Sequence, residues 1–459
     1  MIGSYREALK FVYDHIPTEL NKKFAGQFGH ERAVHLLALL GDPQNSLKVV
    51  HVAGTSGKGS TAFYISQLLA AHGFTVSLTV SPHLIDIRER CQINNRLISK
   101  KEFVETLNQI APKITKMERS RYGKSSYFDL MIALFFQFSA NNKVDYAVVE
   151  TGLGGLYDST NTIKRSDKLC VITRIGLDHT EILGNSLDKI ARQKSGIIQK
   201  NNTLITHRQV KPVRSVFEKR VKEKKGSLIY AREKLEGLEL NSPALYQREN
   251  CSLALTALYH LGERDEFKVD RNKIRRTLLE AHFPGRMDVF VKRGRTVIAD
   301  GAHNKQKMAS FIKSLKNLTK KKIPFLVAFK EGKKYKAMLN EIIPAASDII
   351  VTSFITKGMD LTIKSEKGEM IVDYLKKKKI SKMIFIPDNK KAVKELLKKK
   401  SKYVAITGSL YLLSAVYSII RSKVKVDNRY GNRSLKRNRK QLGRNSFYSH
   451  FNANAFLDG

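Results

Sequence analysis

The sequence predicts an α/β protein with two domains, each built around a largely parallel β-sheet, and a basic tail. The chain of 459 residues exceeds what one hydrophobic core usually organises. Residues 47–200 alternate between apolar strand-like runs and helical patterns, as in a doubly wound parallel sheet. The alternation restarts after about residue 285. We therefore place the domains at residues 1–287 and 288–421, and a flexible tail at residues 422–459.

The first domain is expected to carry N-terminal helices and then strands with helices between them. Residues 3–41 have helical spacing and end at a Gly-Asp-Pro turn. The predicted strands are residues 47–52, 74–80, 144–149 and 169–175, and the later helices are residues 60–71, 100–117, 129–140 and a helix from residue 186. Residues 86–98 are polar, and we expect irregular structure there.

The second domain is smaller and repeats the α/β pattern. Its predicted strands are residues 296–299, 325–328, 348–352, 383–386 and 403–407. An apolar helix at residues 410–420 closes it. From Ser422 onward the composition shifts to Arg, Asn, Ser and Gly, which favours a flexible tail.

The formal net charge of +41 is the most unusual feature of the composition. A nucleic-acid partner would explain it, and the Arg-rich tail keeps that alternative open. However, most of the excess consists of Lys spread over the body of the chain, in runs such as residues 376–379 and 398–400, without interleaved aromatic residues. We therefore expect a lysine-rich surface that attracts acidic small molecules, and no nucleic-acid partner.

Cysteine use and hydropathy indicate the compartment. Cys91, Cys170 and Cys251 show neither metal-ligand spacing nor a disulfide framework. Residues 1–16 carry charges throughout and do not resemble a signal peptide. Residues 410–420 are too short to cross a bilayer. We expect a cytoplasmic protein without a membrane partner.

The most informative segment is the glycine-rich loop after the first strand. It reads His-Val-Ala-Gly-Thr-Ser-Gly-Lys-Gly-Ser-Thr from His51 to Thr61 and leads into a helix. Glycines let backbone amides converge on a phosphate, and the helix N-terminus adds positive potential. The predicted phosphate-binding residues are Gly57, Lys58, Gly59, Ser60 and Thr61. A glycine turn without a ligand is the alternative, because Val52 and Gly59 depart from the standard P-loop pattern.

Polar residues stand at the carboxyl ends of predicted strands, where parallel sheets bind their ligands. Ser81, Glu150 and His179 each follow a different strand. Carboxylate and hydroxyl oxygens are suitable ligands for Mg²⁺. A solvated carboxylate at Glu150 and a packing role for His179 are the plainer alternatives.

Short segments in a fixed order carry a family resemblance. They are residues 51–61, 81–84, 89–90, 148–155, 158–161, 178–179, 183–184, 194–197, 284–286, 300–304 and 408–410. Together they resemble the folylpolyglutamate synthase/dihydrofolate synthase family of the Mur ligase group, over about residues 5–420.

The resemblance implies a P-loop ATPase-like N-terminal domain, a Rossmann-like C-terminal domain and a nucleotide bound between them. It implies ATP-dependent ligation of L-glutamate to the carboxylate of a folate, of dihydropteroate, or of both. The carboxylate would be activated as an acyl phosphate and then attacked by the glutamate amine. The implied cofactors are ATP and two Mg²⁺ ions, and we expect a monomer.

The resemblance also implies roles at the phosphate end of the nucleotide. Lys58 and the loop amides would hold the outer phosphates. Ser81 and Glu150 would bind one Mg²⁺, and His179 would bind the second. Lys194 matches a lysine that is carbamylated, a change that turns a cation into an anion. An ordinary helix-surface lysine is the alternative.

The remaining implied roles concern the rest of the nucleotide and the substrates. Asn250 would contact adenine, and Arg286 would reach ATP unless it is a surface arginine near the hinge. Asp300 would hold the ribose or adenine, and His303 would lie beside the acyl-transfer point. The implied catalytic residues are Lys58, Lys194, Asp300 and His303. The implied substrate residues are Phe128, Asp158, Arg90 and Ser409, the last for glutamate.

Several residues depart from the family pattern. Ser56 replaces Asn, Leu156 replaces Arg, Asp129 replaces Glu, Ile132 replaces Thr, and Tyr246 replaces His. Because several of these changes lie near the expected pterin site, a related amide ligase with another acceptor, such as a peptidoglycan or amino-acid polymer precursor, stays open.

Overall fold

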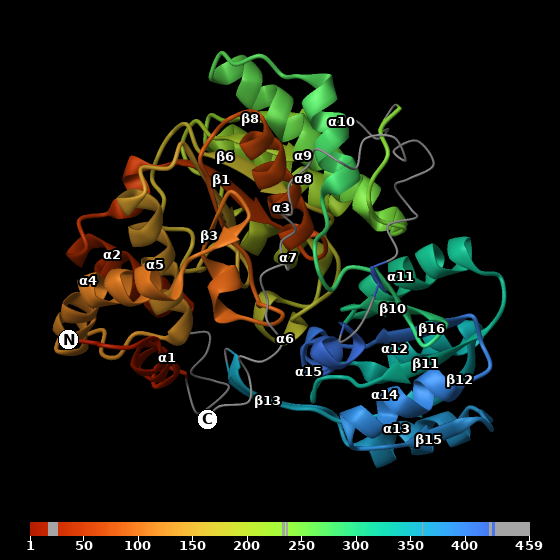
Figure 1. Ribbon diagram of the computed structural model, residues 1–459. Helices are drawn as coiled ribbons and strands as arrows, with labels where there is room; N and C mark the ends of the chain where they lie inside the picture. Colours follow the sequence, from red (N-terminus) through yellow and green to blue (C-terminus); the bar gives the residue numbers. More distant parts are fainter. Residues whose placement is uncertain (17–25, 232–234, 236, 360, 422–424, 427–459) are drawn as a thin grey trace. The chain divides into compact units, whose positions relative to one another are not determined.

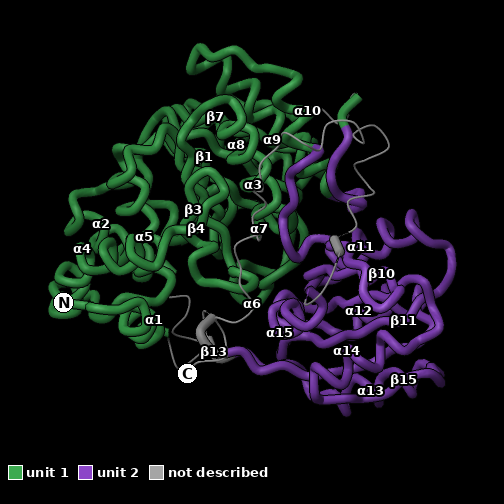
Figure 2. Tube along the Cα trace, viewed as in Figure 1, with its two compact units in different colours: residues 1–238, 247–278, 358–361 green, residues 239–246, 279–357, 362–459 purple. Residues whose placement is uncertain are grey.

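The computed structural model describes residues 1–16, 26–231, 235, 237–359, 361–421 and 425–426 (Figure 1). The chain divides into two compact units, each with its own large sheet. Unit 1 comprises residues 1–238, 247–278 and 358–361, and unit 2 comprises residues 239–246, 279–357 and 362–459 (Figure 2). The chain therefore passes between the units several times, which the sequence pattern did not predict.

The sheet of unit 1 has the order β4-β3-β2-β5-β1-β6-β7-β8. Its strands are β1 Lys48–Ala53, β2 Val76–Thr79, β3 Gln92–Ile93, β4 Arg96–Leu97, β5 Tyr146–Glu150, β6 Leu169–Ile172, β7 Thr203–Thr206 and β8 Ser227–Tyr230. All pairs from β2 to β8 are parallel, whereas β3 and β4 are antiparallel at one edge. Strand β1 lies in the middle, so the loop that follows it opens at the centre of the carboxyl edge.

The helices of unit 1 follow the predicted alternation as far as residue 195, and those beyond residue 200 were not predicted. They are α1 Tyr5–Tyr13, α2 Gly26–Leu39, α3 Lys58–Ala71, α4 Lys100–Glu118, α5 Tyr127–Asn141, α6 Thr180–Leu183, α7 Leu187–Ser195 and α8 Lys211–Glu223, with most of α9 Leu245–Arg264 and α10 Arg271–Glu280. Two of them begin with capping boxes, in which Ser99 pairs with Glu102 and Ser126 pairs with Asp129. Such reciprocal hydrogen bonds satisfy amides that a helix start leaves open.

Helices pack on the central strands of unit 1. Val49 of β1 belongs to an apolar cluster with α1, α4 and α5, and Ala53 belongs to a second cluster with α7 and α8. Because side chains alternate along a strand, His51 points to the same face as both residues. Helix α3 packs against β1, β2 and β5.

The large sheet of unit 2 has the order β15-β12-β11-β16-β10-β9-β17. Its strands are β9 Asp288–Lys292, β10 Arg295–Asp300, β11 Ile323–Val327, β12 Ala346–Val351, β15 Met383–Phe385, β16 Tyr403–Thr407 and β17 Lys425–Val426. The helices are α11 Lys305–Leu318, α12 Tyr335–Ile342, α13 Gly368–Lys377, α14 Asn389–Lys398 and α15 Leu410–Arg421. Helices α11 to α13 share one apolar cluster with β11 and β12, while α14 contacts β11 and β12 and α15 contacts β10 and β16.

The predicted fold class is confirmed, with three local differences. Residues 86–98 are not irregular: they form a 3₁₀ turn, Ile87–Arg90, and the β3–β4 hairpin. Strands β7, β8, β9, β13 Ile355–Met359 and β14 Leu361–Lys364 were not predicted. Lys425–Val426, placed in the predicted tail, pair with β9. The rest of that tail, residues 422–424 and 427–459, lies outside the described residues.

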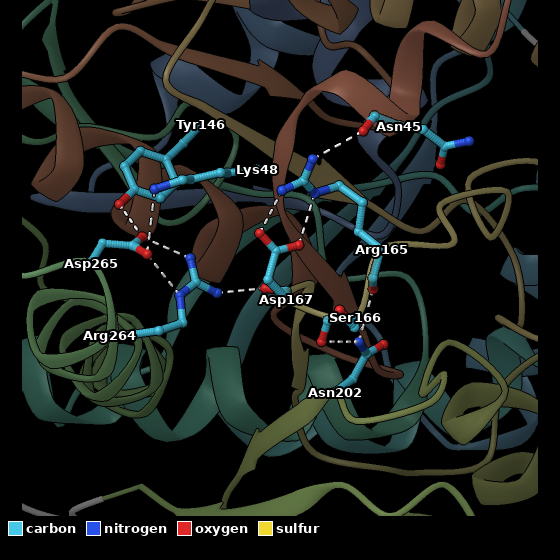
Figure 3. Close-up of polar contacts among 9 residues, drawn as sticks. All are labelled: Asn45, Lys48, Tyr146, Arg165, Ser166, Asp167, Asn202, Arg264 and Asp265. Atoms are coloured by element: carbon cyan, nitrogen blue, oxygen red, sulfur yellow. Dashed lines mark hydrogen bonds and ion pairs between the residues drawn. The ribbon is translucent and has the colours of Figure 1, made fainter.

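The amino edge of the unit 1 sheet is a network of paired charges (Figure 3). Lys48 and Tyr146 begin β1 and β5 side by side. Both contact the Asp265 carboxylate, the lysine at 3.4 Å, and Arg264 binds the same carboxylate at 2.7 Å. Burial raises the pKa of Asp265, but the hydrogen bonds and charges of these partners outweigh it and lower that pKa to about 2. The end of α9 is thereby tied to the strand starts.

A second set of contacts continues along this edge. Arg264 donates to the Asp167 carbonyl at 2.5 Å, and Asp167 forms an ion pair with Arg165 at 2.7 Å. Arg165 also donates to the Asn45 carbonyl, and Asn202 donates to the Arg165 carbonyl, both at 3.0 Å (Figure 3). The charges at this edge are therefore satisfied by one another and by backbone carbonyls.

None of the helices in the described residues is long and apolar enough to span a bilayer.

Candidate active site

The glycine-rich loop turns sharply from β1 into α3. Gly54 and Gly57 have φ of 142° and 93°, a region that favours glycine. A Cβ on Gly54 would lie 1.8 Å from the Thr173 hydroxyl, and one on Gly57 would lie 2.1 Å from Asn250 Oδ1. The backbone can approach these neighbours only without side chains. Lys58 is the first residue of α3, at the helix N-terminus where anions bind.

The loop is tied to the segment that follows β6. Thr55 donates its hydroxyl proton to the Gly176 carbonyl and accepts from the Gly176 amide, both at 3.0 Å. Its own amide donates to the Arg174 carbonyl at 3.1 Å. Because His179 lies three residues beyond Gly176, these bonds bring the His179 segment to the same edge of the sheet as the loop.

Asn250 of α9 lies directly against the phosphate loop, as the Gly57 contact indicates. Its amide donates to Gln247 Oε1 at 2.9 Å, one turn earlier on the helix. Ser60 and Thr61, in the first turn of α3, are buried. The predicted nucleotide residues of unit 1 therefore gather around one loop.

Ser81 and Glu150 are brought together as predicted. The Ser81 amide donates to Glu150 Oε2 at 2.8 Å. Glu150 is paired in register with Val52, two residues before the loop, and is 6% exposed. The solvated-carboxylate alternative for Glu150 is therefore wrong. The buried carboxylate lies at the same edge of the sheet as the loop, and its role as a Mg²⁺ ligand stays a prediction.

His179 and Lys194 follow on α6 and α7. His179 precedes α6 and is about one-third exposed, with Asp178 and Glu181 carboxylates within 3.9 Å and 3.7 Å of its ring nitrogens. Lys194 is 4% exposed, so the helix-surface alternative for it is wrong. Among the described residues, no group of three or more His, Cys, Asp or Glu side chains forms a metal cluster. The predicted Mg²⁺ ligands are Ser81, Glu150 and His179, which include only two residues of these four types. Their role as metal ligands stays a prediction.

A second glycine turn, residues 152–155, packs against the end of α7. A Cβ on Gly155 would lie 2.9 Å from the Lys194 carbonyl, and the Leu156 amide donates to the Gln193 carbonyl at 2.7 Å. A Cβ on Gly152 would lie 2.4 Å from the Phe128 ring. The turn thus connects a predicted catalytic residue to a predicted substrate residue.

The Asp158 carboxylate closes this turn. It accepts from the Leu153 amide at 2.7 Å, from the Thr160 amide at 3.0 Å and from the Thr160 hydroxyl at 2.5 Å. A bond from the Gly152 amide adds a fourth donor. Burial raises the pKa of Asp158, and these hydrogen bonds oppose the rise. The carboxylate is oriented without help from Leu156, where the family has Arg.

Arg90 lies in a separate buried cluster. It is 2% exposed, donates from Nε to His83 Nδ1 at 3.0 Å, and its guanidinium lies 5.2 Å from the Tyr127 ring centroid. Tyr127 is the neighbour of Phe128 on α5. Arg90 therefore bonds to His83 and lies over Tyr127, and its role toward a substrate stays a prediction.

In unit 2, the predicted residues meet at the carboxyl edge of its sheet. Asp300 ends β10 and accepts from the Tyr246 hydroxyl at 2.5 Å and from the Ala302 amide at 2.8 Å. Burial raises the pKa of Asp300 to about 6, against the hydrogen bond from Tyr246 and the charge of Arg286. The Arg286 guanidinium lies beside Gly301, the residue after Asp300, because a Cβ on Gly301 would lie 3.3 Å from Arg286 Nη1.

His303 and Ser409 lie at the same edge of unit 2. His303 contacts the Gly301 carbonyl through Nδ1 at 2.8 Å and Lys307 through Nε2 at 2.8 Å. Strand β16 pairs Thr407 with Asp300, which places Ser409 two residues beyond that pair. Ser409 is buried, and its hydroxyl accepts from the Tyr411 amide at 3.1 Å.

With this geometry established, comparisons with known proteins identify the family. A profile of the Mur ligase middle domain matches residues 52–256, and a profile of the dihydrofolate synthetase C-terminal domain matches residues 286–419. The dihydrofolate synthase/folylpolyglutamate synthase of Bacillus subtilis is 29% identical to this chain. The match covers 91% of this chain and 99% of that protein. The chain belongs to the folylpolyglutamate synthase/dihydrofolate synthase family. The dihydrofolate synthetase of Saccharomyces cerevisiae is also 29% identical, with 99% of its length and 87% of this chain covered.

Solved structures agree with this family. A Thermotoga maritima folylpolyglutamate synthase is 26% identical with a TM-score of 0.75, and the match covers 93% of this chain and 99% of that one. A structure described as an FPGS–AMPPCP–folate complex is 25% identical with a TM-score of 0.74, and the match covers 90% and 98% of the two chains. The relatives therefore match along nearly their whole length.

Two features of the site were not predicted. The sequence predicts no role for His51, and its contacts with Thr160 and Thr151 do not follow from the loop pattern. The Tyr246–Asp300 hydrogen bond was not foreseen either. The sequence signal that could have indicated a role for His51 is its position as a polar residue within an apolar strand.

Proposed function

We propose that this protein is an ATP-dependent ligase that joins L-glutamate to the carboxylate of a folate, of dihydropteroate, or of both. The observation that carries the proposal is the meeting of the phosphate loop, the Ser81–Glu150 pair and the residues after β6 at one edge of the unit 1 sheet. The names of the relatives supply the acceptor class.

The proposed reaction has two balanced steps. In the first, an oxygen of the acceptor carboxylate attacks the γ-phosphorus of ATP, and the bond between that phosphorus and ADP breaks. In the second, the glutamate amine attacks the acyl carbon, and inorganic phosphate leaves with the former carboxylate oxygen. The amine loses a proton as the amide forms.

The loop is suited to the first step. Amides of a turn with positive φ and the start of α3 supply donors that are fixed before the reaction, and Lys58 adds a positive charge. Ser60 and Thr61 add hydroxyls in the same turn. Asn250, which packs on Gly57, is the proposed contact for the base end of the nucleotide.

Mg²⁺ would neutralise charge on the phosphates. Ser81 and Glu150 offer a hydroxyl and a carboxylate, and His179 is the candidate ligand for a second ion. This small number of protein ligands is compatible with Mg²⁺, because that ion usually keeps waters and substrate oxygens in its coordination shell. Lys194 is buried, and carbamylation would replace its buried cation by an anion that a bound Mg²⁺ could pair with.

The residues of unit 2 complete the proposal. Arg286 is assigned to ATP, Asp300 to its ribose or adenine, His303 to the acyl-transfer point and Ser409 to glutamate. In unit 1, Asp158, Phe128 and Arg90 are assigned to the acceptor. The proposed enzyme works in the cytoplasm, as a monomer.

The test is ADP release by purified protein with Mg²⁺, glutamate and either a reduced folate or dihydropteroate. The expected result is release that needs both glutamate and one of these acceptors, with a product heavier by one glutamate residue. No stimulation by either acceptor would reject the folate assignment. Release with a peptide or another carboxylic acid alone would favour the related amide ligase.

A further inference from the structure

His51 is a fully buried histidine within the central strand of unit 1, and the proposed reaction gives it no role. Its Nε2 lies 2.9 Å from the Thr160 hydroxyl and 3.2 Å from the Thr151 hydroxyl. Its Nδ1 has no hydrogen-bond partner among the described residues. A buried ring nitrogen without a hydrogen bond lowers the stability of the fold, so we expect His51 to have a function that offsets this cost.

The neighbouring bonds fix which nitrogen carries the proton. The Asp158 oxygens receive four donors, which is the acceptor-only pattern of an ionised carboxylate. The single hydroxyl proton of Thr160 points to Asp158, so Thr160 accepts from His51. Nε2 of His51 is therefore the protonated nitrogen.

The ring is held neutral by its surroundings. Burial lowers the pKa of His51 well below its usual value, and the charge of Lys168 lowers it further. Lys168 is itself buried and donates to the Ile163 carbonyl at 3.2 Å. His51 is thus a fixed hydrogen-bond donor and not an acid or a base near neutral pH.

We propose that His51 is a positioning residue for the acceptor site, which donates from Nε2 to Thr160 and so orients the Asp158 carboxylate and the glycine turn 152–155. This inference rests on the proposed function, because that function makes Asp158 an acceptor residue. The chain of bonds runs from the central strand to the turn that packs on Phe128 and on the end of α7. A rigid strand thereby sets the position of a loop residue.

The test compares variants of the two linking residues by steady-state kinetics. His51→Leu and Thr160→Val should each raise the KM for the acceptor about five- to tenfold, the effect of one lost buried hydrogen bond. The KM for ATP should stay within about twofold. His51→Gln, whose amide nitrogen reaches the Nε2 position, should restore most of the acceptor affinity.

Controls separate positioning from general destabilisation. Ser139→Ala removes another buried side-chain bond of unit 1, to Ser77 at 2.9 Å, and should leave both KM values unchanged. The double variant His51→Leu/Thr160→Val should be no worse than about the worse single variant, because both act through one chain. Additive effects, or an equal rise in the KM for ATP, would overturn the proposal.

A spectroscopic measurement keeps the test valid if the leucine variant does not fold. In ¹⁵N spectra of the wild-type protein at pH 7, the His51 ring should be neutral with its proton on Nε2. A ring protonated on Nδ1 would overturn the proposal. If wild-type protein uses no folate-type acceptor, the proposed function fails while this tautomer assignment can still be correct, so the two failures are distinguishable.

Discussion

The two edges of the unit 1 sheet are built from the same strands but use their polar groups differently. At the amino edge, carboxylates pair with side-chain cations, as Asp265 does with Arg264 and Lys48. At the carboxyl edge, Glu150 accepts from the Ser81 amide, and Asp158 accepts from backbone amides and from the Thr160 hydroxyl. The first arrangement pairs opposite charges, whereas the hydrogen bonds of the second orient a carboxylate.

This difference indicates where stability and function reside. Lys48 begins β1 within an ion-pair network, and Lys58 begins α3 after the same strand has ended. The amino edge also ties α9 to β1 and β5, which supports the strands that carry the loop. We therefore expect changes at the amino edge to alter stability, and changes at the carboxyl edge to alter turnover.

The largest effect is expected for Lys58→Ala. Removing the cation at the phosphate loop should lower ADP release by about a thousandfold or more, because a charge fixed at the transferred phosphoryl group is lost. The melting temperature should change little. Lys48→Ala is the matched control at the other end of the strand, and it should keep nearly full turnover. Similar losses of turnover in both variants would contradict the comparison.

Lys194→Ala should reduce turnover about a hundredfold while ATP binding changes little. If the buried lysine acts as a carbamate, a small carboxylic acid can enter and restore the negative charge, so added acetate or formate should recover part of the activity. The measurement is ADP release across a series of such acids. Wild-type turnover in the alanine variant would refute the carbamate role.

Gly57→Ala should weaken ATP binding about tenfold or more. The added Cβ would lie 2.1 Å from Asn250 Oδ1, and alanine is strained at a φ of 93°. Isothermal titration with a non-hydrolysable ATP analogue measures the effect. Gly294→Ala, in a turn of unit 2 with φ of 69° but open space at the Cβ position, controls for backbone strain alone. Equal weakening in both would remove the argument for Asn250.

The smallest effect is expected at the amino edge. Asp265→Asn should lower the free energy of unfolding by on the order of 1 kcal/mol at neutral pH, after allowance for solvent screening. The pKa of Asp265 is lowered from 3.8 to about 2 in the folded protein. Its contribution is therefore present above about pH 4 and is lost as the pH falls through about 2.

Urea unfolding between pH 3 and pH 7 measures this contribution. The difference between wild type and Asp265→Asn should shrink toward the acid end of the range. Glu105→Gln, which breaks an exposed pair with Lys101 on α4, should change stability by no more than about 0.5 kcal/mol. A difference that grows as the pH falls would contradict the assigned direction.

Much of the fold could be predicted from local sequence patterns, such as runs of consecutive apolar residues. The run before Gly54 predicted β1, and the apolar run before Glu150 predicted β5, because buried parallel strands are continuously apolar. The 3₁₀ turn and hairpin at residues 86–98 were missed because the two strands have only two residues each. Such short strands depend on pairing with β2 and not on their own pattern.

The candidate site was predictable where residues lie at strand ends. Ser81 and Glu150 follow neighbouring strands of one sheet, so their contact follows from topology. The Asn250–Gly57 contact and the Tyr246–Asp300 bond join segments far apart in sequence, and only tertiary packing brings them together. The His51 proton could be assigned only after its partners were known.

The central claim is that the γ-phosphoryl group of ATP passes to the acceptor carboxylate before glutamate is joined. The most direct measurement uses a folate or dihydropteroate labelled with ¹⁸O in that carboxylate, with glutamate, ATP and Mg²⁺. The account predicts that the released phosphate carries one ¹⁸O atom for each amide formed. Amide formation with unlabelled phosphate would contradict it.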